Sequence, residues 1–142
     1  MFDQGGTFFE DLTIGQSASF NRTVTESDIL AYSELSGDTN PIHLDEDYAG
    51  RSMFKGRIAH GLLSAGFLSA VLGTKLPGPG AVYVAQTLRF KAPVRIGDHV
   101  VARVELVGLD GDRKRATFKT VCEVGDKVVI DGDAVLFVPS RN

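Results

Sequence analysis

Residues 58–72 read IAHGLLSAGFLSAVL and form the most apolar stretch of the chain. The pattern predicts a helix that begins near His60-Gly61 and ends near Gly73, too short to span a bilayer. Apolar residues occur on every side of this helix, so we expect protein all around it. Several small residues along it would let a β-sheet approach its backbone closely: Gly61, Ala65, Gly66, Ser69 and Ala70.

Beyond the break at residues 77–80 (PGPG), the pattern changes to four valine-rich, partly alternating segments. They cover residues 81–94, 100–109, 115–124 and 128–138. Turn signals separate them, and consecutive strands joined by tight turns predict an antiparallel meander. The expected fold class is therefore α+β, with a curved antiparallel sheet wrapped around the long central helix.

The segment before the central helix predicts one more strand and one more helix. Residues 18–24 begin a short extended run, and Thr25 with Asp28 marks a helix start. Gly37 provides the stop for this helix. Three residues are expected to form its apolar face: Ile29, Tyr32 and Leu35. Residues 45–49 are expected to add one or two helical turns.

The composition is that of one globular domain over residues 1–142, with 43% hydrophobic residues, 23% charged residues and a formal net charge of −3. This charge disfavours binding of nucleic acid or of an anionic membrane through bulk attraction. Cys122 is the single cysteine, which excludes an intramolecular disulfide and a thiolate zinc cluster and favours a reducing, cytoplasmic location. Residues 1–6 lack the apolar region of a signal peptide.

A polar loop, Gly37-Asp38-Thr39-Asn40-Pro41-Ile42-His43, precedes the central helix. Pro41 restricts Asn40 to extended backbone and stiffens the loop. Asp38 and His43 stand five residues apart in it, so both side chains can point into one cleft and act as an acid–base pair. Spacing alone leaves a simpler alternative, in which Asp38 caps a turn and His43 packs within the loop.

Gly61 marks the expected N-terminus of the central helix. A glycine there exposes backbone N–H groups and the positive end of the helix dipole, which suits a developing oxyanion. The simpler interpretation is that Gly61 only permits close packing of helix against sheet, with His60 as the helix cap. Ser69 lies two turns further along, and the simpler interpretation for it is a small core hydroxyl that is hydrogen-bonded to its own helix.

Other candidate sites have less support from the sequence. Arg89, Lys91 and Arg95 form a basic cluster, which is either a solvated face or a contact for the phosphates of a ligand. Cys122 lies in a predicted strand with no histidine nearby in sequence, which disfavours a cysteine nucleophile. We expect no metal site, because the residues that could bind one match no familiar metal motif in their spacing: Asp38, His43, Asp45 and His60.

Three segments together resemble the MaoC-like R-specific enoyl-CoA hydratases, which have the hot-dog fold. Residues 38–43, DTNPIH, look like the hydratase motif of that family, in which the aspartate and the histidine are catalytic. Residues 59–63, AHGLL, look like the start of its central helix. Residues 86–98, QTLRFKAPVRIGD, look like the strand and turn that follow. The similarity extends over nearly the whole chain in order and spacing.

The resemblance implies reversible hydration of a trans-2-enoyl-CoA to an (R)-3-hydroxyacyl-CoA. Asp38 and His43 would hold one water between them and activate it for attack at C3, and the proton would go to C2. The backbone N–H of Gly61 would stabilise the negative charge that accumulates on the thioester oxygen.

The resemblance also implies supporting roles and partners. Asn40 would orient the loop or the water, Ser69 would lie near the substrate, and Arg89 and Lys91 would meet the phosphates of coenzyme A. Coenzyme A is part of the substrate, so no separate cofactor is expected. A homodimer is expected, with the active site near the dimer interface.

Three other functions fit the same fold. A 3-hydroxyacyl-carrier-protein dehydratase shares the chemistry, and its basic cluster would meet an acidic acyl carrier protein. The Asp-x-Asn-Pro-x-His pattern of residues 38–43 disfavours a thioesterase. The presence of Asp38 and His43 disfavours a non-catalytic acyl-thioester-binding protein. The sequence leaves open the acyl chain length and the pathway, whether polyester (polyhydroxyalkanoate) synthesis or fatty-acid β-oxidation.

Overall fold

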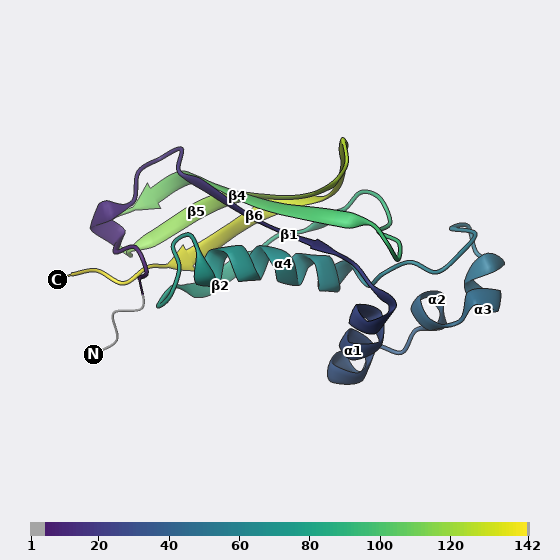
Figure 1. Cartoon of the computed structure of the whole chain (residues 1–142). Helices are drawn as coiled ribbons and strands as arrows, with labels where there is room; N and C mark the ends of the chain where they lie inside the picture. Colours follow the sequence, from purple (N-terminus) through teal and green to yellow (C-terminus); the bar gives the residue numbers. More distant parts are fainter. Residues whose placement is uncertain (1–4, 142) are drawn as a thin grey trace.

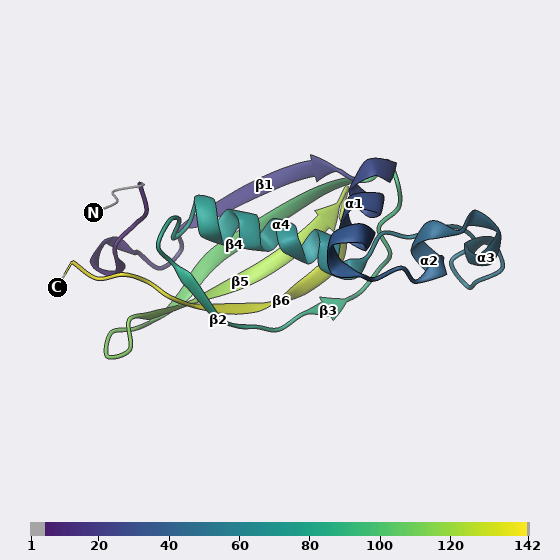
Figure 2. The ribbon, with the colours of Figure 1, turned by 90° about the horizontal axis from the view of Figure 1, so that it is seen from below.

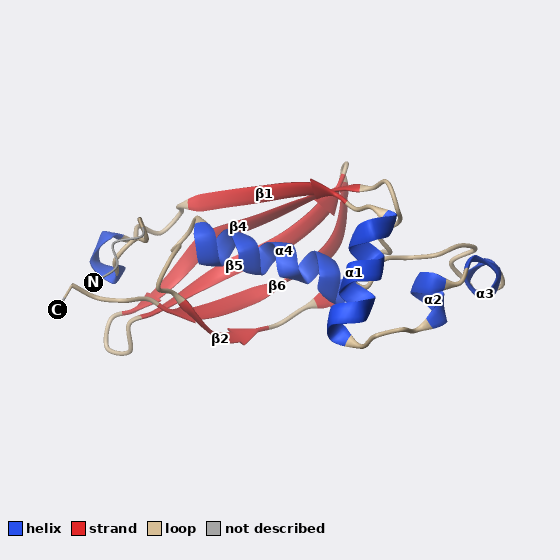
Figure 3. Cartoon of the chain, turned by 60° about the horizontal axis from the view of Figure 1, so that its bottom comes forward, coloured by secondary structure: helices blue, strands red, loops and turns tan. Residues whose placement is uncertain are grey.

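A six-stranded antiparallel sheet curves around one long helix, α4 (Gly61–Thr74), in the computed structural model, which describes residues 5–141. Figure 3 shows α4 lying across one face of the sheet. Three shorter helices lie beyond the N-terminal end of α4 (Figure 1): α1 (Glu26–Ser36), α2 (Pro41–Leu44) and α3 (Glu46–Gly50). This arrangement confirms the expected α+β class. The expectation about the N-terminal residues falls mostly on residues 1–4, outside the described ones.

Three consecutive strands form the centre of the sheet: β4 (His99–Asp110), β5 (Arg115–Val124) and β6 (Lys127–Phe137). Strand β1 (Ser17–Thr23) pairs with β4, after a short 3₁₀ turn at Phe9–Asp11. Alternate residues of β4 face α4 and are fully buried, in accord with the period of two of a strand. These are Val100, Ala102, Val104 and Leu106.

The segment predicted as one strand over residues 81–94 instead forms β2 (Val82–Gln86) and β3 (Arg89–Phe90), and both pair with β6. Between them the Thr87 carbonyl oxygen passes over Gly132 of β6, only 1.9 Å from where a Cβ would stand. This close crossing interrupts the strand in a way that an alternating pattern does not reveal. Strand β2 lies beside β6, at the side of the sheet opposite β1 (Figure 2), and not beside β4, the next long strand in the sequence. The predicted meander is therefore confirmed only for β4, β5 and β6.

Helix α1 begins and ends where the sequence predicts. The Thr25 hydroxyl accepts from the Asp28 N–H at 3.1 Å, and the Asp28 carboxylate accepts from the Thr25 N–H at 3.1 Å. This reciprocal capping box satisfies two backbone donors that the helix itself leaves unpaired. Gly37 ends the helix with φ of 82°, a conformation that glycine adopts without steric cost.

The buried face of α1 differs from the prediction. Ile29 and Ser33 are buried, whereas Leu35 is 88% exposed. Six residues turn a helix through about 600°, so Leu35 points well away from Ile29, whereas a residue four positions on lies almost above it. The polar Ser33 therefore shares the inward side of α1 with Ile29.

The polar loop ahead of α4 contains more helix than predicted. Pro41 occupies the first position of α2, and the Asn40 side chain caps it by accepting from the Ile42 N–H at 3.1 Å. Proline is well suited to this position because its missing N–H would be unpaired there in any case. The turns expected over residues 45–49 are present as α3, capped by the Asp45 carboxylate.

Helix α4 is buried on the side that faces the sheet but not on every side, contrary to the prediction. Phe67, Leu68, Val71 and Leu72 belong to the core. The opposite side of the helix is exposed in the single chain at Leu62, Gly66, Ser69 and Gly73. Within residues 5–141, no helix is both long enough and apolar enough to cross a membrane.

Candidate active site

Arg57 and Ile58 fix the backbone and the imidazole of His43. Its Nδ1 lies 2.8 Å from the carbonyl oxygen of Ile58. Because a carbonyl only accepts hydrogen bonds, Nδ1 carries the proton of the neutral ring and Nε2 carries the lone pair. The backbone is fixed as well, since Arg57 Nε donates to the His43 carbonyl at 2.7 Å and Arg57 also binds the Glu26 carboxylate. His43 thus presents a fixed proton acceptor.

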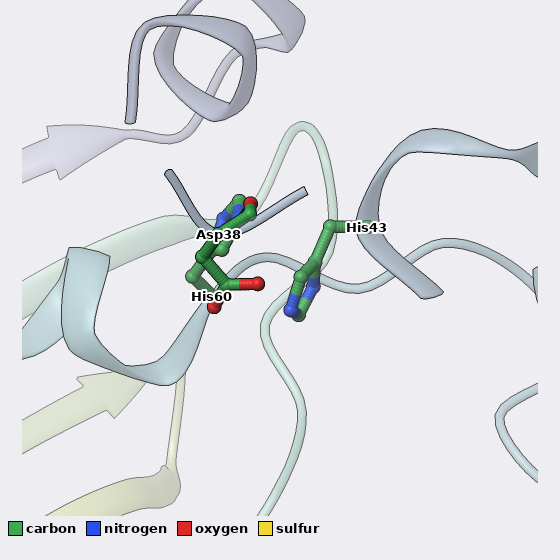
Figure 4. Close-up of side chains that lie close together, drawn as sticks. All are labelled: Asp38, His43 and His60. Carbon is green, nitrogen blue, oxygen red and sulfur yellow. The ribbon is translucent and has the colours of Figure 1, made fainter. Parts of the chain in front are cut away.

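Asp38 directly follows the glycine that ends α1, and its carboxylate points toward the His43 ring (Figure 4). One carboxylate oxygen accepts from the Asn40 N–H at 3.2 Å, which forms a tight local turn. The Asp38 N–H donates to the Ser36 hydroxyl at 3.1 Å. Asp38 is exposed in the single chain. The structure brings the two predicted catalytic side chains together.

His60 is a third member of this group, a position that the sequence does not predict, since it indicates a helix cap or a metal ligand of unfamiliar spacing. It stands at the N-cap of α4 but makes no side-chain capping bond. Its Nε2 lies 3.0 Å from the Asp38 carbonyl oxygen and 3.1 Å from the Ser33 hydroxyl. Its ring stacks on the ring of His43 with 3.8 Å between centroids. Burial lowers the pKa of His60 below its usual 6.5.

Gly61 begins α4 directly beside this group, as the oxyanion prediction requires. A Cβ at this position would stand 2.5 Å from the ring of Phe90. Phe90 comes from β3, so the edge strand and the helix N-terminus meet here without room for a side chain. The packing interpretation of Gly61 is therefore correct, and it is compatible with a free backbone N–H at the helix N-terminus.

Two hollows adjoin the predicted catalytic residues, and both are lined by His43, His60, Gly61 and Phe90. The smaller, with a volume of about 200 Å³, also includes Asp38. The larger, of about 250 Å³, extends between α4 and the sheet over mainly apolar side chains. Phe90 had no role in the sequence prediction, and its position in both walls follows from the pairing of β3 with β6.

Of the serines of α4, it is Ser64 and not the predicted Ser69 that is a buried core hydroxyl. Ser64 lines the larger hollow, is fully buried, and its hydroxyl has no hydrogen-bond partner among the described residues. It lies four residues after His60, so the two side chains share one side of the helix. Ser69 is exposed and lines neither of the two hollows. Its predicted place near the substrate stays a prediction.

The basic cluster is partly neutralised. Arg89 Nε lies 2.9 Å from one carboxylate oxygen of Asp131, and Lys91 Nζ lies 3.5 Å from the other. Arg95 donates to the carbonyl of Phe54 at 2.6 Å and shapes a loop. Of the three cations, Lys91 is the one that lines the larger hollow. A ligand phosphate at this place would compete with Asp131.

Asp38, His43 and His60 form, within residues 5–141, the one group of three potential metal ligands whose atoms lie within 4.8 Å of one another. The two imidazoles are stacked, with 30° between their planes. One nitrogen of each ring already contacts a backbone carbonyl, His43 Nδ1 that of Ile58 and His60 Nε2 that of Asp38. The arrangement suits acid–base chemistry better than metal binding.

Comparison with known proteins places this site in context. The family model described as MaoC like domain matches residues 10–132. An (R)-specific enoyl-CoA hydratase from Rhodospirillum rubrum is 60% identical over 134 residues, which cover 94% of this chain and 93% of the relative. A 3-hydroxybutyryl-CoA dehydratase from Methylorubrum extorquens is 52% identical over 134 residues, covering 94% of this chain and 85% of the relative.

A solved structure gives the same result for the fold. The (R)-hydratase from Aeromonas caviae involved in polyhydroxyalkanoate biosynthesis superposes with a TM-score of 0.88 and 38% identity. The match covers 92% of this chain and 99% of that chain. This agreement confirms the hot-dog fold that the sequence resemblance implied.

Proposed function

This chain belongs to the MaoC-like dehydratase family, and on that premise we propose that it is an (R)-specific enoyl-CoA hydratase. It adds water reversibly to a trans-2-enoyl-CoA and forms an (R)-3-hydroxyacyl-CoA. The observation that carries the proposal is the meeting of the Asp38 carboxylate, the His43 ring and the N-terminus of α4 around one hollow. The names of the relatives support the thioester substrate and the stereochemistry.

The water is activated by the paired side chains. Nε2 of His43 is the proton acceptor, because Nδ1 is bound to a carbonyl. The Asp38 carboxylate accepts the second hydrogen of the same water and orients its lone pair toward C3. As the new C3–O bond forms, His43 takes the first proton and the π electrons of the C2–C3 double bond move toward the thioester carbonyl. C2 then receives the proton that His43 took, so the elements of one water are added and His43 returns to its neutral form.

The negative charge on the thioester oxygen is stabilised at the helix N-terminus. In this proposal the oxygen lies at the N–H of Gly61, where no side chain is present to block it and the helix dipole is positive. Charge on this oxygen is larger in the transition state than in the substrate, so the contact accelerates the reaction and does more than bind substrate. No metal or separate cofactor has a part in this mechanism.

Supporting roles follow from the positions of the other residues. Asn40 caps α2 and thereby sets the course of the loop between Asp38 and His43. Lys91 lines the larger hollow, and Arg89 pairs with the same Asp131 carboxylate; both are proposed to bind the phosphates of coenzyme A, by exchange with Asp131. We also propose that Ser69 contacts the substrate and that the protein is located in the cytoplasm.

We further propose that the chain is a homodimer. Among the described residues, one edge of strand β2 pairs with no other strand, and three large side chains on β2 are exposed: Val82, Tyr83 and Val84. Leu62 on the open side of α4 is also 57% exposed. Exposed apolar side chains on an unpaired edge strand favour association with another chain. A partner on this side would also cover Ser69 and bring it toward a substrate tunnel.

The test is a substrate panel assayed with the purified chain. We expect hydration of crotonyl-CoA, seen as loss of the enoyl thioester absorbance, with (R)-3-hydroxybutyryl-CoA as the product in chiral analysis. Longer enoyl-CoAs report the acyl range, and an enoyl carrier protein reports the carrier-protein dehydratase alternative. An (S) product, or turnover of the carrier-protein thioester alone, would contradict the proposal. Tight binding of enoyl-CoA without turnover would indicate the non-catalytic alternative.

A further inference from the structure

His60 connects the catalytic loop to the rest of the protein. Its Nε2 contacts the Asp38 carbonyl across 22 positions of sequence. The other hydrogen bonds of residues 38–40 in the described chain are local, to Ser36, His43 and Ile42 or within the segment itself. Because Asp38 is exposed and its side chain is held only by a local turn, the contact with His60 is what ties this segment to α4.

The same ring supports the second catalytic residue. The imidazoles of His60 and His43 stack with centroids 3.8 Å apart, and Tyr32 packs on His60 with 4.7 Å between ring centroids. The Ile58 carbonyl already holds the His43 ring at Nδ1, so the main movement left to the ring is a tilt out of its own plane. A flat ring stacked against it limits that rotation. His60 therefore contacts both members of the pair, one through its edge and one through its face.

The hydrogen bonds define which form of His60 is present. The Asp38 carbonyl requires a donor, so Nε2 carries the proton and Ser33 accepts the same N–H through its oxygen. Nδ1 is buried and has no partner among the described residues. A second proton there would be unpaired and would place a positive charge against the His43 ring, so the neutral form is favoured. Burial lowers the pKa of His60 in the same direction.

Ser33 completes the arrangement from α1. It is 4% exposed and its hydroxyl lies 3.1 Å from His60 Nε2. It is the one buried polar side chain of α1 in the described chain, and it occupies an inward position that an apolar residue would fill at no cost in hydrogen bonding. A serine there holds the N–H of His60 between two acceptors and so sets the plane of the ring.

We propose that His60, held by Ser33, is a positioning residue that fixes the catalytic pair: its Nε2–H holds the Asp38 backbone and its ring face holds the His43 imidazole. The proposal rests on the hydratase function above. His60 contacts neither the water nor the substrate in this scheme and acts through the other two residues. Misplacement of a catalytic group by about 1 Å costs about 10²-fold in rate, which is the size of effect expected when this support is removed.

The test is a double-mutant cycle in the full-length chain, with crotonyl-CoA hydration as readout. His60→Phe keeps a flat ring but loses the donor, and we expect kcat to fall about 10²-fold with KM within about twofold. His60→Gln keeps an N–H donor, and we expect it to retain more activity than His60→Phe. His99→Gln is the matched control and should leave kcat unchanged. His99 is exposed, is hydrogen-bonded to Thr23 and lines neither of the two hollows.

The His43→Gln background separates positioning from general damage. If His60 acts through the catalytic pair, His60→Phe should cost far less in His43→Gln than in the wild type, because coupled residues are non-additive. An equal fold-loss in both backgrounds, or no loss in the wild type, would overturn the proposal. If His60→Phe does not fold, Ser33→Ala and His60→Gln are compared in the same two backgrounds, with equal loss again the contrary result.

Failure of the hydratase function would be recognised separately. A wild-type chain that hydrates no enoyl thioester would refute that function before any variant is compared. The protonation of the two ring nitrogens of His60 can then be measured without substrate, from their ¹⁵N chemical shifts in NMR. We expect the neutral form protonated at Nε2 at pH 7, and a ring protonated at Nδ1 or at both nitrogens would contradict the arrangement.

Discussion

Gly61 has no room for a side chain, because the Phe90 ring occupies the place of its Cβ. We expect Gly61→Ala to lower the free energy of unfolding by about 1–3 kcal/mol, the usual cost of overpacking. Phe90→Ala in the same chain should recover most of that loss, as measured by urea unfolding. Gly73→Ala is the control in the same helix, where a Cβ would meet nothing within 4 Å, and it should be neutral or stabilising. Equal losses for the two alanines would contradict this packing.

His60 makes the stability of the protein depend on pH. The pKa of His60 in the folded chain is lowered from the usual 6.5, chiefly by burial, so the unfolded chain binds a proton more readily. The unfolded state therefore gains protons first as pH falls below about 6.5, and stability decreases from there toward the lower folded pKa. We expect a smaller drop in Tm between pH 7.5 and pH 5.5 for His60→Gln than for the wild type. Parallel Tm curves would contradict the assignment.

Some residue roles could be predicted from sequence and others could not. Asp38 and His43 lie five residues apart in a stiff loop, so the sequence alone is enough to predict that their side chains lie close together. The contacts of His60 with Ser33 and Asp38 join positions 27 and 22 apart. Such contacts depend on how α1 and α4 are placed in three dimensions, and no periodicity in the chain reports that placement.

At the level of elements, Gly132 of β6 lies where the chain between β2 and β3 approaches β6 most closely. A Cβ there would stand 1.9 Å from the Thr87 carbonyl oxygen, so Gly132→Ala must push the segment between β2 and β3 away. We expect a loss of about 1–3 kcal/mol in the free energy of unfolding and reduced hydration activity, since Phe90 follows this segment. The control is Gly108→Ala in β4, whose Cβ would make an ordinary 3.5 Å contact with Thr117. Unchanged stability of Gly132→Ala would contradict the crossing.

The elements that the sequence predicted well are those whose pattern is local. Helix α4 is a long apolar run, the three central strands alternate between turn signals, and the Thr25 and Gly37 caps of α1 are chemical signals at fixed offsets. The division of residues 81–94 into β2 and β3 was not predicted, because it depends on a glycine about 45 residues later in the chain. The exposed side of α4 was not predicted because the apolar pattern is the same on all its sides.

The proposed homodimer belongs to the scale of the whole molecule. Burial of the β2 edge and of the open side of α4 would cover Leu62, Val82, Tyr83 and Val84, and the same contact would bring the two active sites toward the interface. We expect sedimentation equilibrium to give twice the mass of the chain at micromolar concentration. Tyr83→Lys, which places a charge on the edge strand, should shift the equilibrium toward monomer. A wild-type monomer with full activity would contradict the dimer.

The central claim is that Asp38 and His43 activate water for addition to an enoyl thioester. The most direct test is the turnover number of Asp38→Asn with crotonyl-CoA, because asparagine keeps the shape of the side chain but cannot serve as the charged hydrogen-bond acceptor. We predict that kcat of this variant falls about 10²–10⁴-fold, while its circular dichroism spectrum shows that the fold is intact. Near wild-type turnover in that variant would contradict it.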